Sequence, residues 1–462
     1  MNIKSLFGAV DMTEGSPIKK IIQFSIPMII GNFFQQMYNA ADAVIVGEFV
    51  GDNALAAVGS AGPVFNLMLA LFIGIATGAG IMVSQYFGAR KRDDLSRSIG
   101  SIITMTGMAS LAIMIIGSLL AKPLLILLKT PPEIFTWCQG YLTIIFLGFA
   151  GMAYYNILGG ILRGLGDAVS ALVYLIIATV LNIVLDLFFV GVVGIGVYGA
   201  AIATIIAQFI SAYLTYRKLK KMDDVFDLKR EYMKPEKVYS RKMITLGLPS
   251  GITQAIFSLS LLAVQRLTNS FGPMYVAANV IVMRVDGFVM MPAMSFGVAM
   301  TTFAGQNIGA GKMDRVQQGA KSGTVFAMSV SAVISLLIVL FGKNLMAIFT
   351  KTQDLIDISY HVMLILVAGY IVFEITQCLC GTMRGAGDTV APMWISIGAS
   401  VLFRVPAAYL MVHLSKTPQL PQGNFFMLST SLLCTWILGA TLSLIVYRSG
   451  RWKNKALVKA GE

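Results

Sequence analysis

Four acidic side chains lie inside long apolar stretches of this sequence: Asp42, Asp186, Asp286 and Glu374. An ionised carboxylate in the hydrocarbon of a membrane costs a few kcal/mol or more unless it faces the interior of a helix bundle or water. Acids in such positions commonly bind protons or cations during transport. The sequence therefore predicts ion chemistry at these positions, and helices that form a bundle around them.

Two of these acids share their depth with two neutral polar residues. Asp42 lies near the outer end of the first apolar stretch, and Asp186 near the outer end of the fifth. Asn182 precedes Asp186 by one helical turn on the same face, and Thr204 lies near the outer start of the sixth stretch. We predict one site for H⁺ or Na⁺, made of Asp42, Asn182, Asp186 and Thr204. The alternative is four core polar groups, each satisfied separately.

The other two acids are less clearly functional. Asp286 lies two residues from Arg284, so the two side chains do not share a helix face. Each can pair with a neighbour, and the sequence favours a structural ion pair at Asp286 at least as much as an ion or substrate site. Glu374 follows Tyr370 by one turn on the same helix face. The sequence supports two roles for Glu374 equally, a ligand of the coupling ion and a buried structural acid. Further candidates are Gln35 and Tyr38 beside Asp42, Met290, Met291 and Met294 for an apolar substrate surface, and Pro27 as a hinge.

These residues require helices that cross a membrane. The chain of 462 residues is 56% hydrophobic and 12% charged, with a mean hydropathy of +0.77, whereas soluble proteins carry about 25% charged residues. The four cysteines fit neither a zinc site nor a disulfide framework, and we expect no cofactor besides the coupling ion. We predict an all-α integral membrane protein with twelve transmembrane helices, at about 17–47, 54–86, 95–121, 132–160, 168–190, 197–217, 243–270, 275–305, 316–341, 356–382, 390–412 and 424–447.

The basic residues set the expected orientation. With the N-terminus inside, 27 of the 35 Lys and Arg residues fall in cytoplasmic segments and five in outer loops. The positive-inside rule then places both termini in the cytoplasm. Membrane orientation accounts for the net charge of +13, so we expect no nucleic-acid partner.

The second half of the sequence repeats the first, with the same offset between two pairs of motifs. ILRGLGDAVSA at 161–171 returns as TMRGAGDTVAP at 382–392, and QYFGARK at 85–91 returns as QNIGAGK at 306–312. Each half has six spans, so both halves start on the same side, in a parallel repeat related by a pseudo-two-fold axis normal to the membrane. We predict an N-lobe at 1–216, a cytoplasmic linker at 217–242, a C-lobe at 243–447 and a basic cytoplasmic tail at 448–462.

The repeated Arg-Gly-x-Gly-Asp is interpreted as a tight turn, in which glycine supplies positive φ and Asp caps the next helix. The same Gly-x-Gly-Asp pattern marks intramembrane aspartyl proteases, but both copies here fall at helix junctions. The acids in the spans are not repeated, since Asp42 and Asp186 align with Ala263 and Ala407 when these motifs are superimposed. We expect no catalytic residue, and a membrane-embedded hydrolase is only a remote alternative.

With these motifs the chain resembles the multidrug and toxic compound extrusion (MATE) family of secondary transporters over nearly its whole length. The shared features are the two six-span lobes, the repeated Gln-x-x-Gly-Ala-x-Lys loop and the repeated Arg-Gly-x-Gly-Asp turn. The first span is similar to that of the DinF-like branch. In that branch the positions of Asp42, Asn182, Asp186 and Thr204 line an ion-responsive N-lobe site. Tyr370 and Glu374 resemble a cation-binding pair of NorM-like members, but the seventh span lacks the acid that completes their site.

The resemblance implies an efflux antiporter of the inner or plasma membrane of a bacterium. It would export amphipathic, cationic compounds in exchange for H⁺ or Na⁺ by alternating access, and we expect it to act as a monomer in the lipid bilayer. The alternative within transport is a flippase or exporter of a lipid-linked saccharide or another metabolite. Such a saccharide carries phosphates and needs a basic cavity, and the three arginines against four acids in the spans weigh against this alternative.

Overall fold

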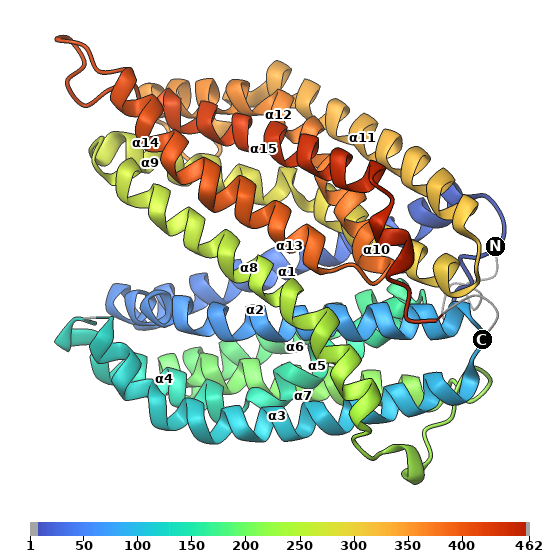
Figure 1. Ribbon diagram of the computed structural model, residues 1–462. Coiled ribbons are helices and arrows are strands. Elements are labelled where there is room, and N and C mark those ends of the chain that lie inside the picture. The colour runs from blue at the N-terminus through green and yellow to red at the C-terminus, as the bar shows by residue number, and fades with distance from the viewer. Residues whose placement is uncertain (1–7, 129, 459–462) are drawn as a thin grey trace. The chain divides into compact units, whose positions relative to one another are not determined.

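The computed structural model describes residues 8–128 and 130–458, which form helices for most of their length (Figure 1). Residues 1–7, Lys129 and 459–462, which belong to the expected N-lobe, an outer loop and the basic tail, lie outside the described residues. The long helices are α1 (Pro17–Val50), α2 (Asp52–Gly88), α3 (Arg92–Leu127), α4 (Pro132–Leu147), α5 (Phe149–Gly164), α6 (Ala168–Asp186), α7 (Val197–Lys220), α8 (Lys237–Asn269), α9 (Pro273–Val289), α10 (Met291–Gly309), α11 (Met313–Ala347), α12 (Gln353–Gly385), α14 (Arg404–Leu414) and α15 (Phe426–Arg448). Shorter pieces are α13 (Val390–Ser396) and the turns η2 (Leu187–Val192), η3 (Arg230–Tyr232), η4 (Ile397–Phe403) and η5 (Arg451–Asn454).

The all-α membrane fold predicted from the sequence is confirmed. Ten of the described helical segments are long and apolar enough to cross a membrane. The pair α4 and α5, bent by 53° where they meet, counts as an eleventh span. The 34-residue helix α1, which contains Pro27, is long enough to be a further span, but it is less apolar and is not among these. Bends and π-helical turns inside spans explain why several apolar stretches exceed the usual length of about twenty residues.

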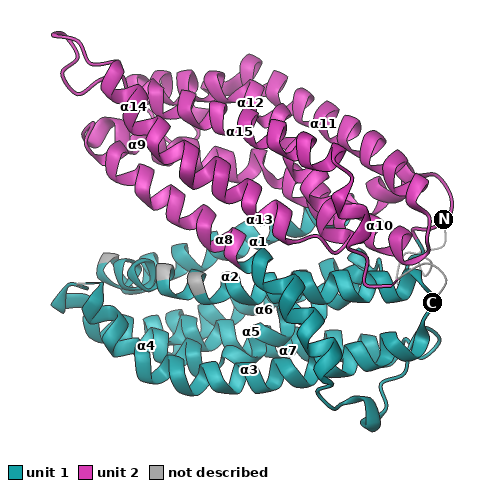
Figure 2. Cartoon of the chain, viewed as in Figure 1, with its two compact units in different colours: residues 1–11, 26–251 teal, residues 12–25, 252–462 magenta. Residues whose placement is uncertain are grey.

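The chain divides into two compact units that differ from the two halves of the sequence (Figure 2). Unit 1 consists of residues 1–11 and 26–251, and unit 2 of residues 12–25 and 252–462. The first part of α1 therefore belongs to unit 2 and the remainder to unit 1, while α8 is divided in the opposite sense. Each changeover lies within three residues of a proline, Pro27 in α1 and Pro249 in α8.

Close helix crossings repeat in the two units. In unit 1, a Cβ atom on Gly160 or Gly164 of α5 would lie 2.6 Å from a backbone oxygen of α2. In unit 2, a Cβ atom on Gly381 or Gly385 of α12 would lie closer than 3.0 Å to a backbone oxygen of α10. Only glycine permits such approaches. Gly160 and Gly164 align with Gly381 and Gly385 in the repeat, so the repeated sequence forms a repeated crossing.

The repeated Arg-Gly-x-Gly-Asp turns have the predicted structural role. Gly166 and Gly387 adopt positive φ, 85° and 95°. The Asp167 carboxylate accepts from the Ser170 backbone N–H at 2.9 Å, which caps the start of α6. Asp388 accepts from the Ala391 N–H at 3.1 Å in the same way. These aspartates cap helices, and this accounts for their presence in both copies of the motif.

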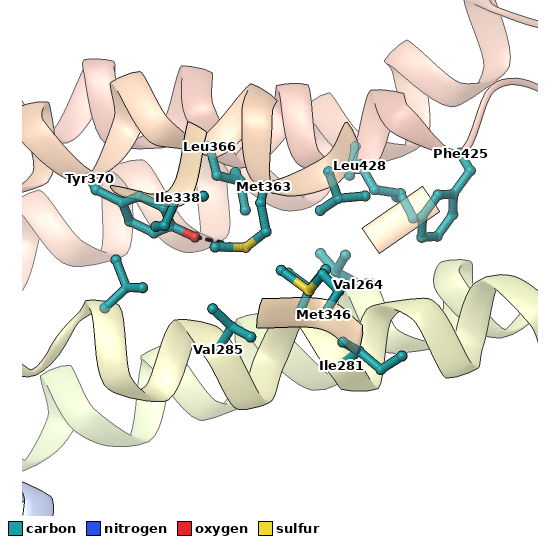
Figure 3. Packing of buried hydrophobic residues seen from close by; sticks show 14 of the residues in the cluster. Val264, Ile281, Val285, Ile338, Met346, Met363, Leu366, Tyr370, Phe425 and Leu428 are labelled. Atoms are coloured by element: carbon teal, nitrogen blue, oxygen red, sulfur yellow. Dashed lines mark hydrogen bonds between the residues drawn. The ribbon is translucent and has the colours of Figure 1, made fainter. Parts of the chain in front are cut away.

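Unit 2 has an extensive hydrophobic core between α9, α11, α12 and α15 (Figure 3). Ile281 and Val285 of α9 face Met363 and Leu366 of α12, and all four side chains are at most 7% exposed. Tyr370 extends this row, and its hydroxyl lies 3.4 Å from the sulfur of Met363. The core fixes the position of the polar groups of α12 relative to α9.

Candidate functional site

A polar site lies inside unit 1, where α1, α6 and α7 meet. Asp42 of α1 and Asp186 of α6 face each other closely enough for their carboxyl groups to hydrogen-bond when one is protonated. Asn182 and Asp186 are completely buried, and Thr204 of α7 is 8% exposed. The structure thus brings together the four residues that the sequence predicted as one site, from α1 and from the consecutive helices α6 and α7.

The hydroxyl of Thr204 joins the three helices at this site. It accepts a hydrogen bond from the Tyr38 hydroxyl of α1 at 3.2 Å. It also accepts from Nδ2 of Asn182 on α6 at 3.5 Å. Because Asn182 donates toward Thr204, its carbonyl oxygen remains available as an acceptor. Tyr38, predicted as a secondary candidate, is therefore part of the site.

Gln208 also belongs to this site, although the sequence analysis did not select it. It lies one turn after Thr204 on α7, is 8% exposed, and its side-chain amide faces the Tyr38 hydroxyl. The i, i+4 spacing from Thr204 was the available signal. We define the carboxylate site as Tyr38, Asp42, Asn182, Asp186, Thr204 and Gln208.

Tyr141 of α4 is a second residue that the sequence analysis missed. Its hydroxyl lies within electrostatic reach of Asp42, Asp186 and Tyr38. No spacing links α4 to the other helices, so only the tertiary fold reveals it. Gln35, which the sequence did select, is half-buried on α1 one turn before Tyr38.

The carboxylate site is rich in acceptors and poor in donors. Five of its buried oxygen atoms have no hydrogen-bond partner among the described residues: Oδ1 of Asp42, both carboxylate oxygens of Asp186, Oδ1 of Asn182 and Oε1 of Gln208. Each unsatisfied buried acceptor costs about 1–3 kcal/mol, and more when charged. A proton shared by the carboxylates, or a hard cation with oxygen ligands, would satisfy this arrangement. Among the described residues no group of three or more His, Cys, Asp or Glu side chains forms a metal site.

A π-helical turn begins directly after Asp186. In η2 the N–H of Val193 donates to the oxygen of Phe188, five residues earlier, at 2.8 Å. π-helical turns within α-helices occur frequently at functional sites because they shift side chains away from the regular register. Here the turn lies next to the carboxylate that faces Asp42.

Unit 2 holds a different cluster around Asp286. The Tyr370 hydroxyl donates to Oδ1 of Asp286. Arg404, at the start of α14 and 7% exposed, acts electrostatically on the same carboxylate. We call Asp286, Tyr370 and Arg404 the unit 2 cluster. Asp286 therefore has a structural partner other than Arg284, whose side chain is exposed on α9 and is not part of the cluster.

The remaining candidates do not join one site. Glu374 is 1% exposed, and its Oε2 atom has no hydrogen-bond partner within residues 8–128 and 130–458; Tyr370 donates to Asp286 rather than to Glu374. Met291 is buried, Met290 packs against the core of unit 2, and Met294 is 47% exposed. Only Met294 thus keeps the accessibility that a substrate surface needs. Pro27 lies inside α1, next to the changeover between units.

The fold and the buried carboxylates define a membrane transporter built from two repeats, and comparison with known proteins specifies the family. A sequence profile described as MatE matches residues 27–188 and 249–410. The chain belongs to the MATE family. It is 32% identical to the probable multidrug resistance protein YoeA of Bacillus subtilis, over 85% of this chain and 86% of that one.

Two further similarities are more distant. The multidrug export protein MepA of Staphylococcus aureus is 24% identical, over 86% of this chain and 88% of its own. The structure of a MOP superfamily transporter from Pyrococcus furiosus superposes with a TM-score of 0.88 at 23% identity, covering 96% of this chain and 97% of the other. The structural similarity shows the fold.

Proposed function

We propose that this protein is a secondary active antiporter that exports amphipathic, cationic compounds in exchange for H⁺ or Na⁺ by alternating access. The observation that carries the proposal is the carboxylate site, where five buried acceptor oxygens have no hydrogen-bond partner in the described part of the chain. Such a site gains most from binding a proton or a small cation. The names of the relatives, multidrug resistance and multidrug export proteins, support efflux as the direction.

Ion binding and drug binding are coupled through α1 in this mechanism. Two carboxylates close together in a low-dielectric interior do not both stay ionised at low cost. A proton shared between Asp42 and Asp186, or Na⁺ held with Asn182 and Thr204 as neutral ligands, removes this repulsion. The ion-bound site then favours one conformation of α1 about Pro27 and releases drug. By linkage, drug must weaken ion binding by the same factor.

Proteoliposomes test this function. Purified protein is reconstituted, and efflux of a fluorescent lipophilic cation is followed first under an imposed pH gradient and then under a Na⁺ gradient. We expect transport against the substrate gradient with one of the two ions, and none with Asp42→Asn. Transport of the cation without any ion gradient, at the same rate in Asp42→Asn, would contradict the proposal.

We further propose that the protein acts as a monomer in the cell membrane with both termini in the cytoplasm. The excess of basic residues on that side supports this orientation. Single cysteines introduced in 223–236 should be labelled in intact cells only by a membrane-permeant reagent. Rapid labelling by an impermeant reagent would reverse the topology.

A further inference from the structure

The segment just before α1 lies in a binding site made by unit 2. We call Met12–Ser16 the α1 leader. Met12 is 1% exposed and Thr13 6%, although neither residue belongs to a helix. Backbone groups buried outside regular structure need hydrogen-bond partners from elsewhere. For the α1 leader these partners come from α10, α11 and the turn between them.

Arg315 of α11 binds the backbone of the α1 leader at three points. Its guanidinium donates to the carbonyl oxygens of Met12 at 3.1 Å, Glu14 at 3.0 Å and Gly15 at 2.6 Å. The planar guanidinium presents five donors in a fixed geometry, which a lysine ammonium does not reproduce. Arg315 therefore holds the leader as a folded segment rather than by a single contact.

The repeated motif QNIGAGK supplies the remaining contacts. Gln306 accepts from the Met12 N–H at 2.8 Å, and Asn307 donates to the Met12 oxygen at 3.2 Å. Lys312 donates to the Thr13 oxygen at 3.0 Å. The glutamine and the lysine that define the motif thus both bind the α1 leader.

Unit 1 binds the segment before α8 in a comparable way, with residues that follow the first copy of the motif. Arg92 donates to the Asp224 oxygen at 3.1 Å and to the Asp227 carboxylate at 3.2 Å. The hydrogen bond from the guanidinium lowers the pKa of the Asp227 carboxyl. Ser101 of α3 donates to the Lys234 oxygen at 3.0 Å. Each unit therefore binds the segment that leads into the helix shared with the other unit.

The α1 leader thus precedes a helix whose later part belongs to a different unit. From Ile26 onward α1 belongs to unit 1, and this part carries Tyr38 and Asp42. Asp11, the residue before Met12, pairs with Arg90 within unit 1 at 3.7 Å. Adjacent Cα atoms are about 3.8 Å apart. Movement of one unit against the other must therefore bend α1, release Asp11 or release the leader.

We propose that Arg315 and Lys312 are positioning residues of the transport cycle, which clamp the α1 leader on unit 2 in one state and release it in the other. The clamp fixes one end of the helix whose other end carries Asp42. Ion binding at Asp42 is then transmitted along α1 to unit 2. This inference rests on the proposed function for its link to the ion, but the clamp itself is measured without transport.

Cysteine labelling in nanodiscs measures the clamp. Thr13→Cys is introduced into a Cys434→Ala background, since the other three native cysteines are buried, and the rate of reaction with a soluble maleimide is recorded. We expect slow labelling, because Thr13 is covered. Arg315→Ala should accelerate it about tenfold or more, since three charge-assisted hydrogen bonds are lost. Arg315→Lys should give an intermediate rate.

Lys321→Ala is the matched control, because Lys321 is an exposed cation on the same helix that lines a groove with Gln318 and Phe326 and has no part in the clamp. It should leave the labelling rate unchanged. Equal labelling rates of Thr13→Cys with and without the Arg315→Ala substitution would overturn the clamp. If Arg315→Ala does not fold, Arg315→Lys alone decides, and a rate equal to that of the parent would overturn it.

The coupling is read in the same assay. Lowering the pH or adding Na⁺ should change the labelling rate of Thr13→Cys, relative to that of a free thiol under the same conditions, about threefold or more, and Asp42→Asn should remove this response. Efflux by Arg315→Ala should show a lower maximal rate at an unchanged KM for the drug. If the labelling rate responds to Arg315→Ala but not to ions, the clamp has no role in transport. Failure of efflux under both gradients, with the ion response of the clamp intact, would instead overturn the proposed function.

Discussion

The same positions in the two repeats hold opposite kinds of side chain. When the repeated motifs are aligned, Asp42 corresponds to Ala263 and Asp186 to Ala407. Ala263 lies on α8 and Ala407 on α14. Where unit 1 has two carboxylates, unit 2 has two methyl groups.

This difference shows that the helix crossings and the ion chemistry are separable. The glycine crossings and the capped turns occur in both units, so they support the helix arrangement that the two repeats share. The two carboxylates of the carboxylate site occupy positions in unit 1 whose counterparts in unit 2 are alanines. The acids of unit 2 occupy other positions, and Asp286 there has a donor in Tyr370 and a cation in Arg404. We therefore expect unit 1 to bind the coupling ion and unit 2 to respond to ion binding in unit 1.

The comparison predicts the largest effect for the two carboxylates of unit 1. Asp42→Asn and Asp186→Asn keep the size of the side chain but remove its charge. Each substitution alone should abolish gradient-driven efflux while expression, folding and some drug binding remain. The double variant should add little, because the two carboxylates act as one unit. Efflux in proteoliposomes and drug binding to the purified protein measure the two effects separately.

Asp286→Asn is the matched control, since it removes a carboxylate from unit 2 with the same change of chemistry. It should retain efflux. Near wild-type efflux against a gradient by either unit 1 variant would make the carboxylate site structural and would remove the proposed mechanism.

Much of this arrangement was predictable from the sequence, because the signals were local. Hydropathy indicates the spans, basic residues indicate the expected orientation, and the matching motifs indicate the repeat. Asp42, Asn182, Asp186 and Thr204 could be grouped because their depth follows from their distance to the span ends. That they lie in contact is a property of the fold, and whether they couple ions is still a prediction.

The parts that the sequence did not indicate depend on packing between distant segments. Tyr141 approaches the carboxylate site from α4 without any spacing that relates it to α1. Arg404 faces Asp286 because α14 follows a π-helical turn, which changes the register of the helix in a way that a regular periodicity does not predict. The contacts of Met12 with Gln306 join residues 294 positions apart.

Gln208 should have the next largest effect, and it tests how far the carboxylate site extends. Gln208→Leu removes one acceptor oxygen and leaves both carboxylates in place. The ion concentration for half-maximal efflux should rise about tenfold, the size of effect that supporting residues have at metal sites. The maximal rate should change less. Gln254→Leu, at an exposed position on α8, is the control, and an ion dependence equal to that of Gln254→Leu would exclude Gln208 from the site.

Glu374 should have a smaller effect than any acid of unit 1. It is buried, but no second carboxylate faces it, and the seventh span, which α8 forms, has no acid to complete a cation site. Glu374→Gln should therefore leave measurable efflux, within about tenfold of wild type. Complete loss of efflux by a well-expressed Glu374→Gln protein would move the coupling site to unit 2 and reverse the comparison.

The smallest effect concerns a position where the two repeats share a left-handed backbone conformation but have different residues. Arg90 adopts φ 57°, and Gly311, its counterpart in the second repeat, adopts φ 71°. A left-handed conformation costs a non-glycine residue about 1 kcal/mol or more relative to glycine. Arg90→Gly relieves this strain but also loses the exposed pair with Asp11, which Arg90→Ala loses as well. Thermal unfolding in detergent should therefore show Arg90→Gly more stable than Arg90→Ala by about 1 kcal/mol, while Gly311→Ala should be destabilised by a similar amount. Equal stability of the Gly and Ala variants at position 90 would mean that unit 1 tolerates this turn without strain. The two repeated loops would then differ in more than the residue at the left-handed position.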